Sequence, residues 1–211
     1  MKTVNYILFF QLFLSISNPV FSGNNLFYEK IVNISKDSIG LTRIPSIGNV
    51  KFTSDCIGFV RYVYYRSGVD ILKTYGDGRG GVSSLYNGMK QRNWIYEGKM
   101  PDLGDLIFFD NTYDVNRDRK WNDALTHIGI VSGYGKNNTI FFIHYASGGV
   151  KEDRINLFYP NTHAFRQKNG KLYVINSHLR FNRGEGYSRK DYIASSFFRC
   201  FGKIYVRQKN E

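Results

Sequence analysis

One cysteine in this chain stands where a thiol could act as a nucleophile. Cys56 follows Ser54 and Asp55 at the beginning of a segment with helical periodicity. The unpaired N–H groups and the dipole at a helix N-terminus stabilise a thiolate, so we expect this position to lower the pKa of Cys56. The alternative is a helical cysteine that faces the core, and such a residue is inert. The chemistry therefore depends on whether a base accompanies the thiol.

A base for Cys56 has to come from the histidines that follow it, which are His127, His144, His163 and His178. A cysteine nucleophile also needs a third polar group to hold its base in the right tautomer. His127 opens a predicted strand, and His144 lies near the end of the next one. If these two strands pair as a hairpin, both imidazoles reach the same end of the sheet. Either residue could instead be a hydrogen-bonded structural histidine.

The segments before residue 100 predict helices. We expect one or two helices over residues 26–42, a helix over about 55–67 and another within 82–96. The second of these carries an apolar stripe at helical spacing, and Gly68 suits its end. Residues 73–82 are too rich in glycine for regular structure.

From residue 103 the hydrophobic period changes to that of strands. Short apolar and β-branched runs alternate with Gly, Asn and Asp turns, at residues 105–110, 127–132, 139–145, 171–175 and 201–206. Helices followed by an antiparallel sheet make an α+β fold.

Residues 1–22 predict an export signal. The apolar run Tyr6–Ser15 is followed by Val20–Ser22, whose residues are typical of a signal-peptidase site. A retained membrane anchor is the alternative, but the run is shorter than the roughly 20 apolar residues that cross a bilayer. Cleavage leaves one domain over residues 23–211, which we expect in the periplasm, in the cell envelope or in the medium.

The net charge of +12 predicts an anionic partner. Wall polymers, acidic lipids and nucleic acid would all be attracted, but export and the scattered basic residues argue against nucleic acid. The second cysteine, Cys200, could pair with Cys56 in an exported protein. A chain of this length needs no such link, so we expect Cys200 to be a buried structural residue.

Four segments resemble, in order and in spacing, the successive motifs of the NlpC-type cell-wall peptidases, a papain-like family. The resemblance covers roughly residues 50–155, and its segments are Asp55–Tyr62, Pro101–Phe109, His127–Val131 and Phe142–Val150. It implies that Cys56 is the nucleophile, that His127 is its base and that His144 orients His127. It also implies a papain-like fold, in which the nucleophile helix packs on an antiparallel sheet.

The same resemblance implies a substrate. Members of the family mostly cut peptide bonds in the stem peptides of peptidoglycan, often beside a free amino group that acidic residues near the nucleophile recognise. Asp55 matches the residue before that nucleophile, so substrate binding is implied for it, although an acid favourable to the helix dipole explains it equally well. Ile57 departs from the small residue common in the family, and the upstream tyrosine of some members has no counterpart.

The segment before His127 carries a second chemical pattern. Oxygen-bearing side chains recur in it as they do in calcium loops, at Asp114, Asn116, Asp118 and Asn122. The usual glycine and the final acid of such a loop are replaced by Arg119 and Leu125. A solvated, Asx-rich turn is the alternative to a calcium site.

These observations predict an exported cysteine hydrolase that cleaves peptide or amide bonds in peptidoglycan through an acyl-enzyme on Cys56. We expect a monomer that needs no cofactor for the chemistry, with stem peptides and anionic envelope polymers as partners. One alternative keeps the same three residues in an amidase or a lipid acyltransferase. The other is a non-catalytic wall-binding protein, in which Cys56 is idle.

Overall fold

A six-stranded antiparallel sheet with helices on both faces forms the centre of the protein. The computed structural model describes residues 22–180 and 192–206, so the predicted export signal lies outside the described residues except for Ser22. The helices of the first half are α1 (Ser22–Asp37), α2 (Cys56–Arg66), α3 (Ile71–Tyr75) and α4 (Gly81–Gln91). The strands of the sheet are β1 (Ile95–Tyr96), β2 (Leu106–Phe109), β3 (His127–Tyr134), β4 (Ile140–Ala146), β5 (Gly149–Ile155) and β8 (Phe198–Gly202), in the order β1-β8-β2-β3-β4-β5.

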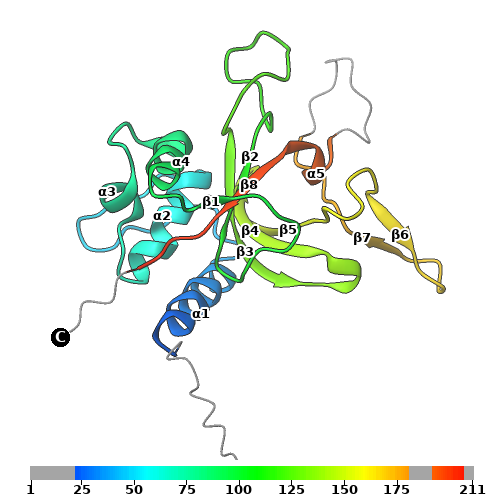
Figure 1. Ribbon diagram of the computed structural model, residues 1–211, viewed down its shortest axis with the longest axis horizontal. Helices are drawn as coiled ribbons and strands as arrows, with labels where there is room; N and C mark the ends of the chain where they lie inside the picture. The colour runs from blue at the N-terminus through cyan, green and yellow to red at the C-terminus, as the bar shows by residue number, and fades with distance from the viewer. Residues whose placement is uncertain (1–21, 181–191, 207–211) are drawn as a thin grey trace, which may run out of the picture.

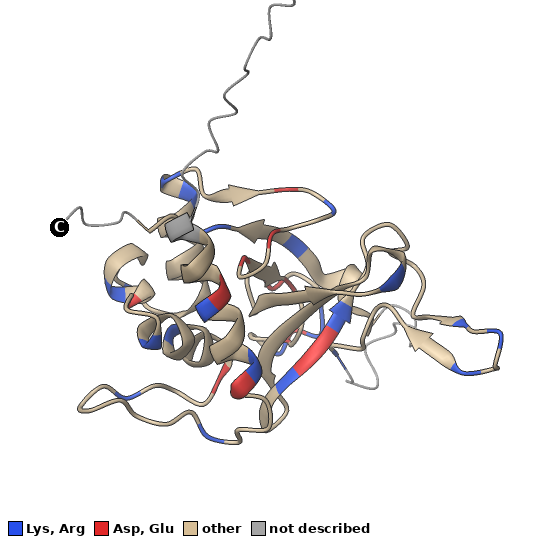
Figure 2. Ribbon diagram, turned by 90° about the horizontal axis from the view of Figure 1, so that it is seen from below, with Lys and Arg blue, Asp and Glu red and all other residues tan. Residues whose placement is uncertain are grey.

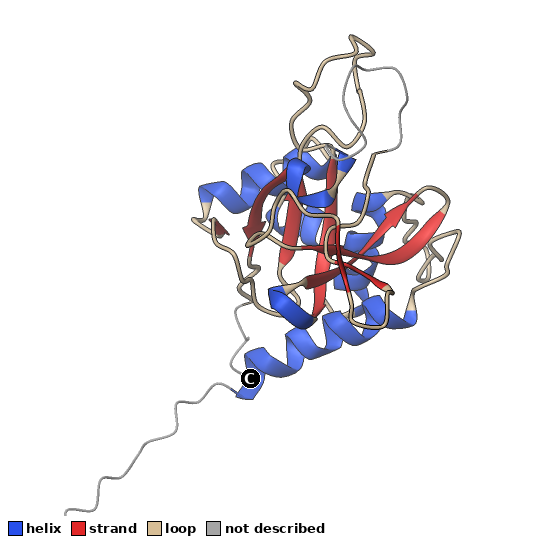
Figure 3. Cartoon of the chain, turned by 90° about the vertical axis from the view of Figure 1, so that its right-hand side faces the viewer, coloured by secondary structure: helices blue, strands red, loops and turns tan. Residues whose placement is uncertain are grey.

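A small second sheet and a short helix lie on the face of the main sheet opposite to α2, α3 and α4. A separate two-stranded sheet pairs β6 (Ala164–Arg166) with β7 (Leu172–Val174), and α5 (Ala194–Phe197) leads into β8. Figure 1 shows α2, α3 and α4 on one side of the main sheet and α5 with β6 and β7 on the other. Figure 3 shows the strands gathered at the centre, with helices behind and below them in that view. A short 3-10 turn, η1 (Lys136–Asn138), joins β3 to β4.

The central strand β2 is covered on both faces of the sheet, by the helices α1–α4 on one and by α5 on the other. All four of its residues are fully buried. Because side chains alternate along a strand, Leu106 and Phe108 pack against the helices α1–α4, whereas Ile107 and Phe109 join a second apolar cluster with α5. Burial of both faces explains the continuous apolar run in the sequence.

The helix that carries Cys56 forms where it was predicted. Asp55 is the N-cap of α2, and its Oδ1 accepts hydrogen bonds from the N–H of Gly58 (2.8 Å) and the hydroxyl of Thr53 (2.8 Å). The apolar stripe is buried against β3 and β4, with Phe59 and Val63 completely inaccessible. The chain then leaves the helix through Gly68, whose φ of 102° suits glycine. The α+β fold is therefore confirmed, with the cysteine helix packed on an antiparallel sheet.

Several elements differ from the sequence prediction. The helix expected within 82–96 ends at Gln91, and a short strand follows. The strand expected at 171–175 pairs only in the small sheet. The pattern did not predict β5, because its charged stretch Lys151–Arg154 hides the alternation of an edge strand.

The surface fits the expected scatter of charge. Among the described residues, Figure 2 shows Lys and Arg spread over many separate elements. Cys56 and Cys200 are both free thiols, and Cys200 is buried in the core as expected. Across residues 22–180 and 192–206, no helix combines the length and apolar character needed to span a bilayer.

Candidate active site

A pocket of ≈ 670 Å³ lies between the start of α2 and the open end of the β3–β4 hairpin, where β3 begins and β4 ends. This volume lies in the range of ordinary ligand sites. The residues around it include Asp55, Cys56, Tyr113, His127, His144 and Lys151. The structure therefore brings the three predicted catalytic side chains, which come from three different elements, into one cavity.

Cys56 is the first residue of α2 and is partly buried at this pocket. The backbone N–H groups of Ile128, Ile57 and Cys56 face its sulfur and lower the pKa of the thiol. Burial and, after it, the charge of Asp55 act more strongly in the opposite direction, so that the pKa of Cys56 rises to about 11. The expected lowering of this pKa is therefore wrong, because desolvation and a neighbouring carboxylate outweigh the helix N-terminus.

This environment predicts how Cys56 reacts with an alkylating reagent. A pKa raised to about 11 leaves the thiol protonated at neutral pH, and only the thiolate reacts. We expect the rate of iodoacetamide modification at Cys56 to be low at neutral pH and to climb steadily through the alkaline range, as followed by peptide mass spectrometry. A rate that is already maximal at neutral pH would contradict this environment.

His127 and His144 meet as the hairpin prediction required. β3 and β4 pair antiparallel, and His127 Nε2 lies 2.5 Å from His144 Nδ1 with the two rings nearly perpendicular. Burial is the main cause that lowers the pKa of both imidazoles, that of His127 well below its ordinary value. Both rings are therefore neutral at neutral pH, and His127 is able to accept a proton.

The sequence analysis missed a carboxylate behind the two histidines. His144 Nε2 lies 2.9 Å from Asp153 Oδ2, and the same oxygen accepts an ion-pair hydrogen bond from Lys151 Nζ at 2.8 Å. Burial raises the pKa of Asp153, but its two partners outweigh burial and hold that pKa at about 2. The hairpin register could have revealed this residue, because Asp153 pairs with Phe142, two residues before His144 on the same face.

The long loop between β2 and β3 forms another wall of the pocket and extends beyond the end of the sheet (Figure 1). Its ends are tied together by hydrogen bonds from Leu125 N–H to Asp110 Oδ1 (2.7 Å) and from Thr112 N–H to Thr126 Oγ1 (2.9 Å). Tyr113 projects from this loop into the pocket, where burial and the neighbouring Cys56 raise the pKa of its hydroxyl. Tyr113 is therefore a pocket residue that the sequence analysis did not single out.

The four predicted calcium ligands lie on the exposed part of this loop. Asp114 accepts hydrogen bonds from the N–H groups of Asp118 (3.2 Å) and Arg119 (2.8 Å), and Asn122 donates to Asp118 (2.9 Å). Arg119 has a φ of 62°, so it adopts the conformation of the glycine it replaces. Within the described ranges no cluster of three or more His, Cys, Asp or Glu side chains is arranged for a metal. Calcium binding by this loop stays a prediction.

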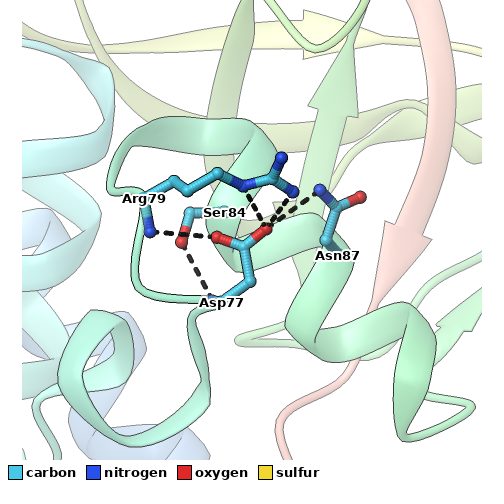
Figure 4. Close-up of polar contacts among 4 residues, drawn as sticks. All are labelled: Asp77, Arg79, Ser84 and Asn87. Atoms are coloured by element: carbon cyan, nitrogen blue, oxygen red, sulfur yellow. Dashed lines mark hydrogen bonds and ion pairs between the residues drawn. The ribbon is translucent and has the colours of Figure 1, made fainter.

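The first turn of α4 also lines the pocket, through Gly81, Val82 and Ser83, and the glycine-rich segment 76–80 leads into it. Figure 4 shows how Asp77 holds this segment. Its Oδ2 accepts hydrogen bonds from Arg79 Nη2 (2.5 Å) and Asn87 Nδ2 (3.1 Å), while its own N–H donates to Ser84 Oγ (3.0 Å). These contacts give an irregular segment a defined shape beside the pocket.

Comparison with known sequences identifies relatives of this region. The family model described as "NlpC/P60 family" matches residues 46–169. Proteins named "Probable endopeptidase p60" are 28% identical over 108 residues in Listeria innocua serovar 6a and 29% identical over 108 residues in Listeria welshimeri. Each match covers 51% of this chain, but only 18% and 16% of the respective Listeria protein.

Two solved structures are similar to this chain at a low level. One, from Staphylococcus aureus subsp. aureus Mu50, is described as similar to a lipoprotein of the NLP/P60 family; it has 21% identity, a TM-score of 0.37 and coverage of 61% of this chain and 36% of that one. The peptidoglycan hydrolase RipB from Mycobacterium tuberculosis has 17% identity, a TM-score of 0.38 and coverage of 75% and 67%. The family match spans more than half of the chain and contains the cysteine helix, the β3–β4 hairpin and both histidines. The chain therefore belongs to the NlpC/P60 family, and its cysteine-bearing helix on an antiparallel sheet is the papain-like arrangement that the resemblance implied.

Proposed function

We propose that this protein is an exported cysteine hydrolase that cleaves peptide or amide bonds in the stem peptides of peptidoglycan. The observation that carries the proposal is the placement of Cys56, His127 and His144 in one pocket of an NlpC/P60 chain. Cys56 is the nucleophile, His127 the base and His144 the residue that orients it. The chemistry uses only these side chains and water, and the enzyme works as a monomer.

The geometry supports a complete acyl-transfer cycle. Because His127 Nε2 faces His144, Nδ1 is the ring nitrogen left to take the thiol proton as Sγ attacks the carbonyl carbon. The N–H of Cys56 stabilises the oxyanion. The C–N bond then breaks, and His127 returns the proton to the leaving amine. Water attacks the resulting thioester, His127 accepts one water proton, and the departing Sγ recovers it as the acid product leaves.

Asp55 is the proposed contact for a free amino group of the substrate. Its Oδ1 is committed to capping α2, whereas no hydrogen bond from the described part of the chain reaches its Oδ2. Asp55 also lines the pocket beside Cys56. One carboxylate can therefore cap the helix and bind an ammonium group at the same time.

Calcium is proposed as an optional ligand of the loop residues Asp114, Asn116, Asp118 and Asn122. The support is the backbone of Arg119, which takes the conformation of the glycine in a calcium loop. An ion there would stiffen the segment that leads into His127. Anionic polymers of the envelope are the proposed partners of the protein, because its full sequence has a net charge of +12.

Mass spectrometry of digested peptidoglycan tests the proposal and identifies the bond. The protein is incubated with purified walls of several stem-peptide types, with calcium or with a chelator, and the Cys56→Ala protein serves as the blank. We expect peptide fragments with a new free carboxyl group from the wild type alone, and loss of product with chelator if the loop needs calcium. Release of intact stem peptides would support an amidase instead, and acyl transfer to added lipid would support an acyltransferase. Wall binding without any product from either protein would indicate a non-catalytic role.

A further inference from the structure

The hydrogen-bonded series behind Cys56 crosses three neighbouring strands and ends on a carboxylate. His127 from β3 contacts His144 from β4, and His144 contacts Asp153 from β5. We propose that Asp153 is a positioning residue, which fixes the tautomer of His144 and thereby leaves Nδ1 of His127 free to accept the proton of Cys56. This inference rests on the proposed hydrolase function, which it extends to a fourth side chain.

The tautomers follow from the donor and acceptor at each contact. The Asp153 carboxylate is ionised and is acceptor-only, so His144 must carry its proton on Nε2. A neutral imidazole has one N–H, so His144 Nδ1 is an acceptor. His127 must then donate from Nε2 to His144 and has a lone pair on Nδ1. If His144 instead carried its proton on Nδ1, it would donate to Nε2 of His127, and the proton of His127 would lie on Nδ1. That nitrogen could not then accept a proton from the thiol.

Burial of His144 enforces this choice of tautomers. The side chain of His144 is 1% exposed, so no bulk water can replace a partner that it loses. A wrong tautomer of His144 would bring a ring lone pair to the Asp153 carboxylate and leave a buried group unpaired. The position of Asp153 is itself held by Lys151, which donates to the same Oδ2. The ammonium group of Lys151 has no lone pair, so the atom of residue 153 that contacts it must be an acceptor oxygen.

Asp153→Asn and Asp153→Leu separate positioning from simple support of the fold. Leucine has a similar size but removes the acceptor. Asparagine keeps an oxygen, and Lys151 favours the orientation in which that oxygen faces both Lys151 and His144. We expect Asp153→Leu to lower kcat by about 10- to 100-fold with little change in KM, as for other partners that orient a functional histidine. Asp153→Asn is expected to restore most of this loss.

Glu152→Gln is the matched control. Glu152 precedes Asp153 on the same edge strand, and its carboxylate contacts Ser132 at 3.2 Å instead of a histidine. The change removes one negative charge from β5 and leaves the three-strand series intact. We expect wild-type kcat in this variant. An equal loss of kcat in Glu152→Gln and Asp153→Leu would overturn the proposal in favour of a general charge effect.

A spectroscopic measurement tests the proposal without a substrate. The protein contains four histidines, so the 15N ring signals of labelled histidine can be assigned with single His→Gln variants. We expect the wild type and Asp153→Asn to show His144 and His127 as Nε2–H tautomers, and Asp153→Leu to show a mixture. A proton on Nδ1 of His144 in the wild type, or unchanged tautomers in Asp153→Leu, would refute the inference. If the protein cleaved no wall material at all, the proposed function would fall, and the tautomers would still decide the role of Asp153.

Discussion

Replacing Cys56 with alanine is expected to lower kcat/KM for wall-peptide cleavage by a factor on the order of 10³ or more. The substitution removes the sulfur that we propose forms the acyl-enzyme, and no other described side chain in the pocket is a thiol. The activity that persists would come from substrate binding and the remaining N–H donors alone. The measurement is the steady-state rate on a soluble stem peptide identified from the wall digest.

The second cysteine provides a matched control for this variant. Cys200 is buried in β8, and burial raises the pKa of its thiol to about 12. We expect Cys200→Ala to keep its kcat/KM while losing some stability, because it leaves a small cavity in the core. A Cys56→Ala protein that retained the wild-type rate would show that another group is the nucleophile. A rate lost in Cys200→Ala without unfolding would point to a role for the second thiol.

Gly58→Ala is expected to destabilise the fold and to impair the active site together. A Cβ at this position would lie 2.0 Å from the backbone oxygen of Thr53 and 2.4 Å from its hydroxyl oxygen. The backbone cannot yield as a flexible side chain does, so we expect a loss of about 1–3 kcal/mol in the free energy of unfolding, measured by denaturant titration. Because Thr53 and Asp55 hold the first turn of α2, their displacement also moves Cys56. Activity should therefore fall even at temperatures where the variant stays folded.

Gly98→Ala is the control for this substitution. No atom lies within 4 Å of the Cβ it would add. We expect its unfolding free energy and its activity to stay close to those of the wild type. Equal stability of Gly58→Ala and Gly98→Ala would mean that the segment before α2 can move without cost. Such an outcome would mean that the close approach of Thr53 does not require glycine at position 58.

Much of the cysteine helix and of the hairpin was readable from the sequence because both depend on local periodicity. The apolar stripe that includes Phe59 and Val63 fixes which face of α2 is buried, and the strand pattern around His127 and His144 predicts a hairpin with both rings at one end. The four ordered motifs then indicated the family. By contrast, the edge strand β5 was missed. Four consecutive charged residues, which an edge strand tolerates because it is partly exposed to solvent, conceal the alternation of apolar and polar residues typical of a strand.

The sequence by itself therefore determined that helices precede an antiparallel sheet, and that Cys56 begins a helix with one buried apolar face. Only the tertiary structure decided that Asp153 stands behind His144, that Tyr113 reaches the pocket from a long loop and that the pKa of Cys56 is raised instead of lowered. The physical reason is that periodicity is a property of neighbouring residues. Desolvation and contacts between strands depend on how distant segments pack, and that packing sets the pKa values of Cys56, His127 and His144.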